Sequence, residues 1–323
     1  MAISPEIARA EDIYRSWMPR LESTLLPLLH HRPFRGLADH PLVFRYLGLR
    51  VNTLRRAFET ITTSFEVPGD AAVEVDEVAG VPVTRVSTPG TVAGRTVVHF
   101  HGGGYVLGSA HAYREVAARA SRATGATVVL VDFRRAPEHP FPAAIDDTVA
   151  VYRQLVKDGM DPSRTTLSGD SAGGGLVLST LLSLRELGEE LPAAATLWSP
   201  LIDLAATGDS MDRFGGTDPA ANRLMVKIMG GLYLGDADPK QESVALLDAD
   251  LSGLPPLLIQ VGSRECLLDD STRLADRARA QGVQVTLEVV DDVPHVFHVF
   301  ATILPEARDA IERIGAFVTQ HGK

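Results

Sequence analysis

Short apolar runs alternate with longer amphipathic stretches through most of the chain. The apolar runs Thr96–Phe100, Thr127–Phe133 and Leu257–Val261 are rich in β-branched residues, which is typical of strands buried on both faces of a parallel sheet. The stretches between them repeat apolar positions at three- to four-residue steps, which predicts helices. Strands that alternate with helices in this way indicate an α/β fold with a doubly wound, mostly parallel sheet.

The remaining elements follow the same two periods. A hairpin is predicted over residues 72–86, and further strands over Thr165–Ser168, Ala194–Trp198 and Val283–Val290. Helices are predicted over residues 111–124, 143–157, 176–187, 220–233, 270–281 and 305–320.

Two amphipathic helices are predicted ahead of the first strand, over residues 4–28 and 41–60. Pro19 is expected to kink or break the first of them. Their apolar faces cannot be buried by each other alone, so both should pack on the later domain, as an appendage or as a lid. Residues 205–250 are predicted to contain one helix and polar turns, and no strand.

Charge and composition exclude several classes of protein. The net charge is −10, from 31 Lys and Arg against 41 Asp and Glu, and no basic cluster offers a nucleic-acid surface. No run is long and apolar enough for a membrane span, and the N-terminus does not resemble a secretory leader. Cys266 is the single cysteine, so an intramolecular disulfide is impossible. We expect a soluble cytoplasmic protein.

The candidate nucleophile is Ser171, in the sequence Gly169-Asp170-Ser171-Ala172-Gly173 between a strand and a helix. A G-x-S-x-G at such a turn is the nucleophile elbow of α/β-hydrolases, where the glycines leave room for the crossing backbone. The motif alone also fits a glycine-rich turn with an incidental serine. It gains weight only if a base, an acid and oxyanion donors follow in the order that this fold uses.

The candidate base is His295, which lies just after the last predicted strand. His298 is the alternative, three residues further on and in or near a helix. The candidate acid is Glu265, early in the loop after Leu257–Val261, with Asp269 as the alternative. Asp269 also has a simpler explanation, since acidic residues stabilise the first turn of a helix.

Acidic pairs occur at Asp269-Asp270 and at Asp291-Asp292. No ordered set of further ligands accompanies them, so we interpret them as solvated turn residues and predict no metal site. Cys266 is expected to be a small buried thiol.

The candidate oxyanion hole is His101-Gly102-Gly103-Gly104-Tyr105, directly after a strand. Consecutive glycines let backbone N–H groups face a cleft without side-chain obstruction. We predict that the N–H groups of Gly102, Gly103 and Ala172 hold the oxyanion. The run lacks both phosphate-binding glycine patterns, G-x-G-x-x-G and G-x-x-x-x-G-K-[ST].

Five segments now stand in a fixed order along the chain: HGGGY (101–105), DFRRAPEHPFPAAIDD (132–147), GDSAGGG (169–175), GSRECLLDD (262–270) and PHVFH (294–298). Together they resemble the hormone-sensitive-lipase-like branch of the α/β-hydrolases, the bacterial type IV esterases. The resemblance extends over Val81–Ala316. Within this branch the chain is similar to acetyl hydrolases and monoterpene ε-lactone hydrolases.

The resemblance implies an eight-stranded sheet, no cofactor, and a helical cap. Residues 1–60 and 205–245 would form the cap, and 61–204 with 246–323 the catalytic domain. Dimers of this branch often form through the edge strand, here residues 284–290.

The resemblance also assigns roles to Ser171, His295 and Glu265 as nucleophile, base and acid. Many relatives have an aspartate followed by Pro-Leu at the acid position, whereas this chain has Glu265-Cys266-Leu267. A second departure is Phe133-Arg134-Arg135, where Tyr-Arg-Leu is common.

We therefore predict a serine carboxylesterase that acts on small, fairly apolar esters with short to medium acyl chains. The same triad would serve a lactone or amide hydrolase. A binding protein that keeps the fold without catalysis is the alternative from another class.

Overall fold

The computed structural model describes residues 3–16, 41–63 and 65–322. Within them, one sheet holds eight strands in the order β1-β2-β4-β3-β5-β6-β7-β8. The β1–β2 and β2–β4 pairs are antiparallel and all other pairs are parallel. In chain order the strands are β1 (Ala72–Val78), β2 (Val81–Ser87), β3 (Thr96–Phe100), β4 (Thr127–Val131), β5 (Thr165–Asp170), β6 (Ala194–Trp198), β7 (Leu257–Gly262) and β8 (Val285–Val290).

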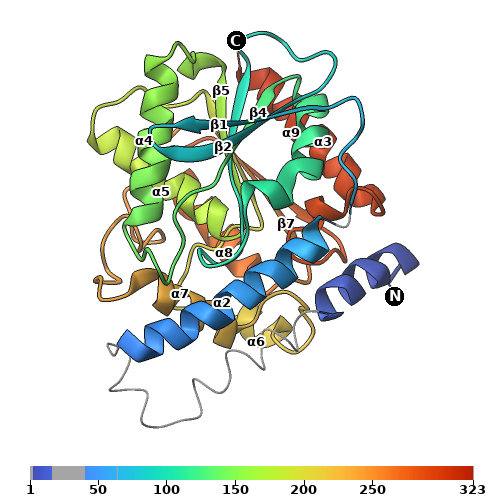
Figure 1. Ribbon diagram of the computed structural model, residues 1–323, viewed down its shortest axis with the longest axis vertical. Helices are drawn as coiled ribbons and strands as arrows, with labels where there is room; N and C mark the ends of the chain where they lie inside the picture. Colours follow the sequence, from blue (N-terminus) through green and yellow to red (C-terminus); the bar gives the residue numbers. More distant parts are fainter. Residues whose placement is uncertain (1–2, 17–40, 64, 323) are drawn as a thin grey trace.

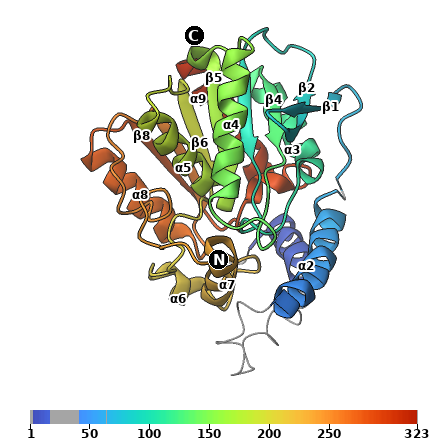
Figure 2. The same ribbon diagram turned by 60° about the vertical axis from the view of Figure 1, so that its left-hand side comes forward.

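Helices cover both faces of this sheet. The first described helix spans residues 5–16, and we call it the N-terminal helix. Helices α3 and α9 pack together on one face and α4 and α5 on the other (Figures 1 and 2). The later helices are α2 (Pro41–Thr62), η2 (Ala110–Tyr113), α3 (Arg114–Thr124), α4 (Ala143–Lys157), η3 (Pro162–Arg164), α5 (Ala172–Glu186), α6 (Ser210–Phe214), α7 (Arg223–Leu234), α8 (Leu268–Ala280), η4 (Phe297–Phe300) and α9 (Pro305–His321).

The middle of the sheet is the core of the molecule. Every residue of β5, β6 and β7 is buried, as expected for parallel strands covered on both faces. The predicted α/β class, the eight-stranded sheet and the opening hairpin are confirmed. None of the helices in the described part of the chain has the length and hydropathy needed to cross a bilayer.

Boundaries differ from the sequence predictions where tertiary contacts decide them. Helix α5 begins at Ala172 rather than at residue 176, because burial holds a glycine-rich first turn in helical form despite its low propensity. Strand β4 ends at Val131, and Phe133 instead stacks on the His101 ring with 4.4 Å between ring centroids. The short helix α6 was not predicted.

Four helices gather near the carboxyl ends of the parallel strands. They are the N-terminal helix, α2, α6 and α7, which lie together at the lower end of the molecule in Figures 1 and 2. Residues 17–28 of the first predicted helix lie outside the described residues. The division into cap and catalytic domain stays a prediction, as does a dimer through residues 284–290. Strand β8, which contains most of that segment, is an edge of the sheet.

Candidate active site

Ser171 occupies the sharp turn between β5 and α5. Its backbone has φ 50° and ψ −120°, a sparsely populated conformation for a residue with a side chain. The turn is possible because glycines flank it at close approaches. A Cβ on Gly173 would lie 2.0 Å from the Phe100 carbonyl oxygen, and a Cβ on Gly169 would lie 2.3 Å from the Gly173 carbonyl oxygen. The main chain therefore presents Ser171 at the end of the strand.

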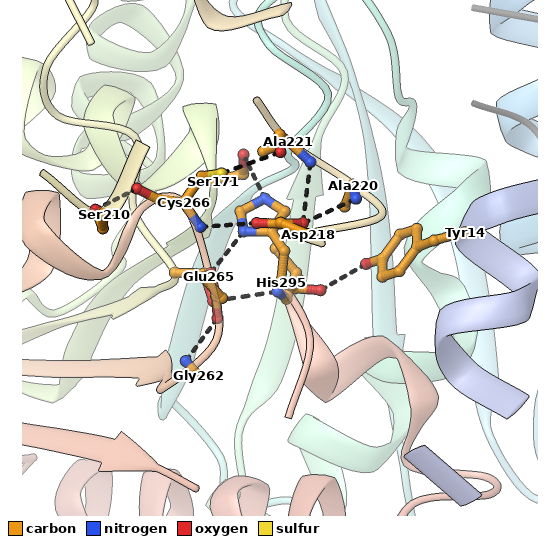
Figure 3. A network of polar contacts seen from close by, with 12 residues as sticks. Tyr14, Ser171, Ser210, Asp218, Ala220, Ala221, Gly262, Glu265, Cys266 and His295 are labelled. Atoms are coloured by element: carbon orange, nitrogen blue, oxygen red, sulfur yellow. Dashed lines mark hydrogen bonds and ion pairs between the residues drawn. The ribbon is translucent and has the colours of Figure 1, made fainter. Parts of the chain in front are cut away.

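Three side chains from distant parts of the sequence form one hydrogen-bonded line (Figure 3). His295 Nε2 lies 3.0 Å from Ser171 Oγ. On the other side of the ring, His295 Nδ1 lies 2.7 Å from Glu265 Oε2. The elbow, the loop after β7 and the loop after β8 supply one residue each. This geometry suits transfer of the serine proton to the imidazole.

The Glu265 carboxylate is fully buried at the end of β7. Its Oε1 accepts hydrogen bonds from the Gly262 N–H at 2.6 Å and from the Ser199 hydroxyl at 2.7 Å. Burial raises the pKa of Glu265, while the hydrogen bonds from His295 and Ser199 favour the carboxylate. Ser199 had no sequence signal, because its partner stands 66 residues away.

The ring of His295 is buried beside this carboxylate. Burial lowers the pKa of His295, but the negative charge and hydrogen bond of Glu265, together with the charges of Asp218 and Asp170, raise it more, so the pKa lies above its ordinary value. Glu265 therefore fixes the proton on Nδ1 and stabilises the charged form that arises when Nε2 takes a proton.

The alternative base, His298, and the alternative acid, Asp269, have other hydrogen-bond partners. The His298 ring is buried against Trp198, and its Nε2 lies 2.9 Å from the side-chain oxygen of Gln260. Burial holds the pKa of His298 well below its usual value. Asp269 lies in the first turn of α8 and accepts a hydrogen bond from the Ser210 N–H at 2.8 Å.

The glycine loop after β3 corrects one prediction. The Gly102 N–H donates to Asp170 Oδ1 at 2.9 Å, so its predicted role as an oxyanion donor is wrong. Gly103 and Gly104 line the cavity beside Ser171, whereas Gly102 is not among the lining residues. The prediction failed because the sequence gives no sign that the carboxylate of Asp170, 68 positions along the chain, takes this N–H.

Asp170 binds the glycine loop to the elbow. Besides the Gly102 N–H, it accepts a hydrogen bond from the Tyr113 hydroxyl at 2.7 Å and lies 3.3 Å from His99 Nε2. The residue is buried. It therefore sets the position of Gly103 and Gly104 relative to the neighbouring Ser171.

Ser171 opens into a largely apolar cavity between the sheet and the overlying helices. Residues before the first strand and residues of α7 supply much of the wall opposite the elbow. The lining includes Tyr14, Phe58, Phe65, Leu107, Val116, Leu201, Met225, Val226, Met229, Leu267, Val299 and Phe300.

Cys266 is buried next to Glu265, as predicted. Its N–H donates to Asp218 Oδ2 at 2.8 Å and its thiol donates to the Ala221 carbonyl at 3.2 Å. Burial raises the pKa of the thiol, which disfavours the reactive thiolate. The residue thus connects the loop of the acid to the segment before α7. In the described ranges, no three His, Cys, Asp or Glu side chains are grouped so that they could hold a metal ion.

Comparison with known proteins identifies the family. A family model described as the alpha/beta hydrolase fold matches residues 97–299. The chain belongs to the α/β-hydrolase family. An acetyl-hydrolase of Streptomyces hygroscopicus is 44% identical over 230 residues, which cover 71% of this chain and 77% of the relative.

Two solved structures resemble this α/β-hydrolase over nearly its whole length. An esterase from the bacterial hormone-sensitive lipase family has a TM-score of 0.88 at 42% identity and covers 100% of both chains. EstE5 soaked with p-nitrophenyl butyrate has a TM-score of 0.84 at 39% identity and covers 99% of both. The resemblance stated from the motifs is confirmed. The chain is an enzyme of the esterase type, within the hormone-sensitive-lipase branch.

Proposed function

We propose that this α/β-hydrolase is a serine carboxylesterase that cleaves small, fairly apolar esters through an acyl-enzyme on Ser171. The observation that carries the proposal is the continuous line from Ser171 through His295 to Glu265, placed at an apolar cavity. A nucleophile, a base and an acid that orients the base are the parts that such catalysis needs.

In the acylation half, His295 Nε2 takes the hydroxyl proton as Ser171 Oγ attacks the ester carbonyl carbon. The carbonyl oxygen then carries the negative charge of the tetrahedral intermediate. When the intermediate collapses, the bond to the alcohol oxygen breaks, and the imidazolium returns its proton to the leaving alcohol. Glu265 keeps Nδ1–H directed toward itself, so that Nε2 offers its lone pair to Ser171.

In the deacylation half, water replaces the alcohol. His295 takes a proton from water, whose oxygen attacks the acyl carbon. The bond to Ser171 Oγ breaks, and the proton passes from His295 to the serine. The products are one carboxylic acid and one alcohol, and the enzyme is regenerated.

The oxyanion is assigned to the N–H groups of Gly103, Gly104 and Ala172. Gly103 and Gly104 line the cavity beside Ser171. Ala172 follows the nucleophile and is the first residue of α5, where backbone N–H groups have no intrahelical partner. These positions favour stabilisation of negative charge near Ser171 Oγ.

The cavity supports an apolar substrate. Aromatic and aliphatic side chains such as Phe58, Phe65, Met225 and Met229 form its wall. The acetyl-hydrolase relative and the EstE5 structure soaked with a butyrate ester favour short to medium acyl chains. The same triad could also hydrolyse lactones or amides, so the selectivity among these classes must come from the residues that line the cavity.

The test is turnover of p-nitrophenyl esters from acetate to laurate, beside a panel of lactones and anilides. We expect the highest kcat/KM on short to medium esters. Ser171→Ala should abolish turnover, whereas Ser183→Ala, a serine on the same helix α5, should leave it unchanged. A wild-type protein without turnover on any of these compounds would refute the proposal.

A further inference from the structure

The peptide bond between His295 and Val296 is held on both sides. Its carbonyl, that of His295, accepts a hydrogen bond from the Tyr14 hydroxyl at 2.7 Å. Its N–H, that of Val296, donates to Ser199 Oγ at 3.1 Å. Val296 has φ 45° and ψ 44°, the left-handed region that a β-branched residue disfavours. Such a conformation persists only where its surroundings enforce it.

Tyr14 is well suited to enforce it. The side chain is buried, and its ring packs edge-on against Phe300 with 5.0 Å between ring centroids. Burial, followed by the charges of Asp170 and Glu265, raises the pKa of Tyr14. The hydroxyl therefore stays protonated, and can donate, up to at least its ordinary pKa of about 10. Figure 3 shows it reaching His295 from the N-terminal helix.

The same helix contacts the loop of the acid. Glu11 precedes Tyr14 by three residues, so the two side chains lie on one face. Glu11 is buried, and its Oε1 lies 3.4 Å from Arg264 Nη1. Its other oxygen accepts a hydrogen bond from Arg15 at 2.6 Å. Arg264 is the residue directly before Glu265.

We infer that the N-terminal helix is a positioning element for catalysis, with Tyr14 and Glu11 fixing the loops that carry His295 and Glu265. This inference rests on the proposed function. The helix thereby does more than supply Tyr14 to the cavity wall. It sets the separation of base, acid and nucleophile, to which rate is highly sensitive.

The Tyr14 hydroxyl is separable from the packing of the helix. Ile7 and Ala10 are buried on the same helix, and the Tyr14 ring keeps its contact with Phe300 when only the hydroxyl is removed. Tyr14→Phe should therefore leave the helix in place and release the His295 carbonyl alone.

The matched control is Tyr152→Phe. Tyr152 is also buried, and its hydroxyl donates to a backbone carbonyl, that of Glu190, at 2.9 Å. It lies on α4 and does not line the catalytic cavity. The two variants lose the same kind of hydrogen bond, so they should lose similar thermal stability.

The experiment measures kcat, KM and melting temperature with p-nitrophenyl butyrate. We expect Tyr14→Phe to lower kcat by about 3- to 10-fold, the equivalent of one net hydrogen bond, with KM within about twofold. Tyr152→Phe should keep the wild-type kcat. Glu11→Gln tests the second contact, and it should lower kcat without changing KM.

A pH profile separates positioning from mere stabilisation. When the His295 loop loosens, Glu265 supports the imidazolium less, whereas Asp218 and Asp170, which also act on His295, stay in place. The acidic limb of kcat/KM should therefore move to lower pH in Tyr14→Phe and stay unchanged in Tyr152→Phe.

Two outcomes overturn the inference. One is a Tyr14→Phe enzyme with the kcat and pH profile of its Tyr152→Phe control. The other, should Tyr14→Phe fail to fold, is a Glu11→Gln enzyme with wild-type kcat. In both cases an inactive Ser171→Ala variant beside active wild type would leave the proposed function intact. Absent wild-type turnover would refute that function itself.

Discussion

Glu265→Gln replaces one carboxylate oxygen by an amide nitrogen and changes the volume little. In the native protein, Oε1 accepts two hydrogen bonds, from the Gly262 N–H and the Ser199 hydroxyl, and Oε2 accepts the one from His295 Nδ1. The glutamine has only one oxygen. Because the Gly262 N–H cannot turn away, the amide oxygen should take the Oε1 position and the NH₂ group should face His295.

This orientation sets the size of the effect. An NH₂ group facing Nδ1 requires Nδ1 to accept, so the ring proton moves to Nε2 and points at Ser171. The imidazole then cannot take the serine proton. Neutralising a triad acid in this way lowers kcat by about 1,000- to 10,000-fold, which is about 4 to 5.5 kcal/mol of transition-state stabilisation.

The assay compares kcat for p-nitrophenyl butyrate in wild type, Glu265→Gln and Asp269→Asn, with melting temperatures to show that each variant folds. Asp269→Asn removes a charge four positions after Glu265 but leaves the triad untouched. A folded Glu265→Gln enzyme with kcat within about tenfold of wild type would show that Glu265 does not set the tautomer of His295. The assignment of the acid fails if Asp269→Asn is the crippling change.

Two further predictions concern pH and the oxyanion loop. The pKa of His295 is raised, and its protonated ring cannot accept a proton from Ser171. We therefore expect kcat/KM to fall with decreasing pH at an apparent pKa above the ordinary histidine value of about 6.5. A fall of kcat/KM centred below this value would contradict the role of Glu265. Gly104 has φ +64°, and a Cβ on it would lie 2.1 Å from Met229 Sδ. Gly104→Ala should therefore displace the Gly104 N–H from the oxyanion and lower kcat on the order of 100-fold. Gly188→Ala, at φ +71° in open space, is the control for backbone strain, and equal activity of the two variants would remove Gly104 from the oxyanion hole.

The sequence predicted the class of fold and the three residues of the hydrogen-bonded line well. Ser171, Glu265 and His295 each follow a strand, and parallel strands bring their carboxyl ends to one edge of a sheet. Their order along the chain was therefore enough to predict that they meet. His298 and Asp269 were open alternatives because one turn of helix or loop cannot be resolved from spacing alone.

The parts that were not predicted depend on partners far away in the sequence. Gly102 belongs to the expected motif, but its N–H turns to Asp170, and no local pattern reveals this choice. Tyr14 has the apolar spacing of any amphipathic helix, and its bond to His295 spans 281 residues. Ser199 likewise connects two loops that only the folded sheet brings together.

The proposed function depends most directly on acylation of Ser171. A fluorophosphonate reacts with an activated serine, forms a P–O bond and releases fluoride, so it marks the nucleophile covalently. After reaction with such a probe, we predict one adduct per chain by intact mass, located on Ser171 by peptide mapping and absent in Ser171→Ala. An adduct on another serine, or no adduct in a protein that turns over esters, would show that Ser171 is not the nucleophile.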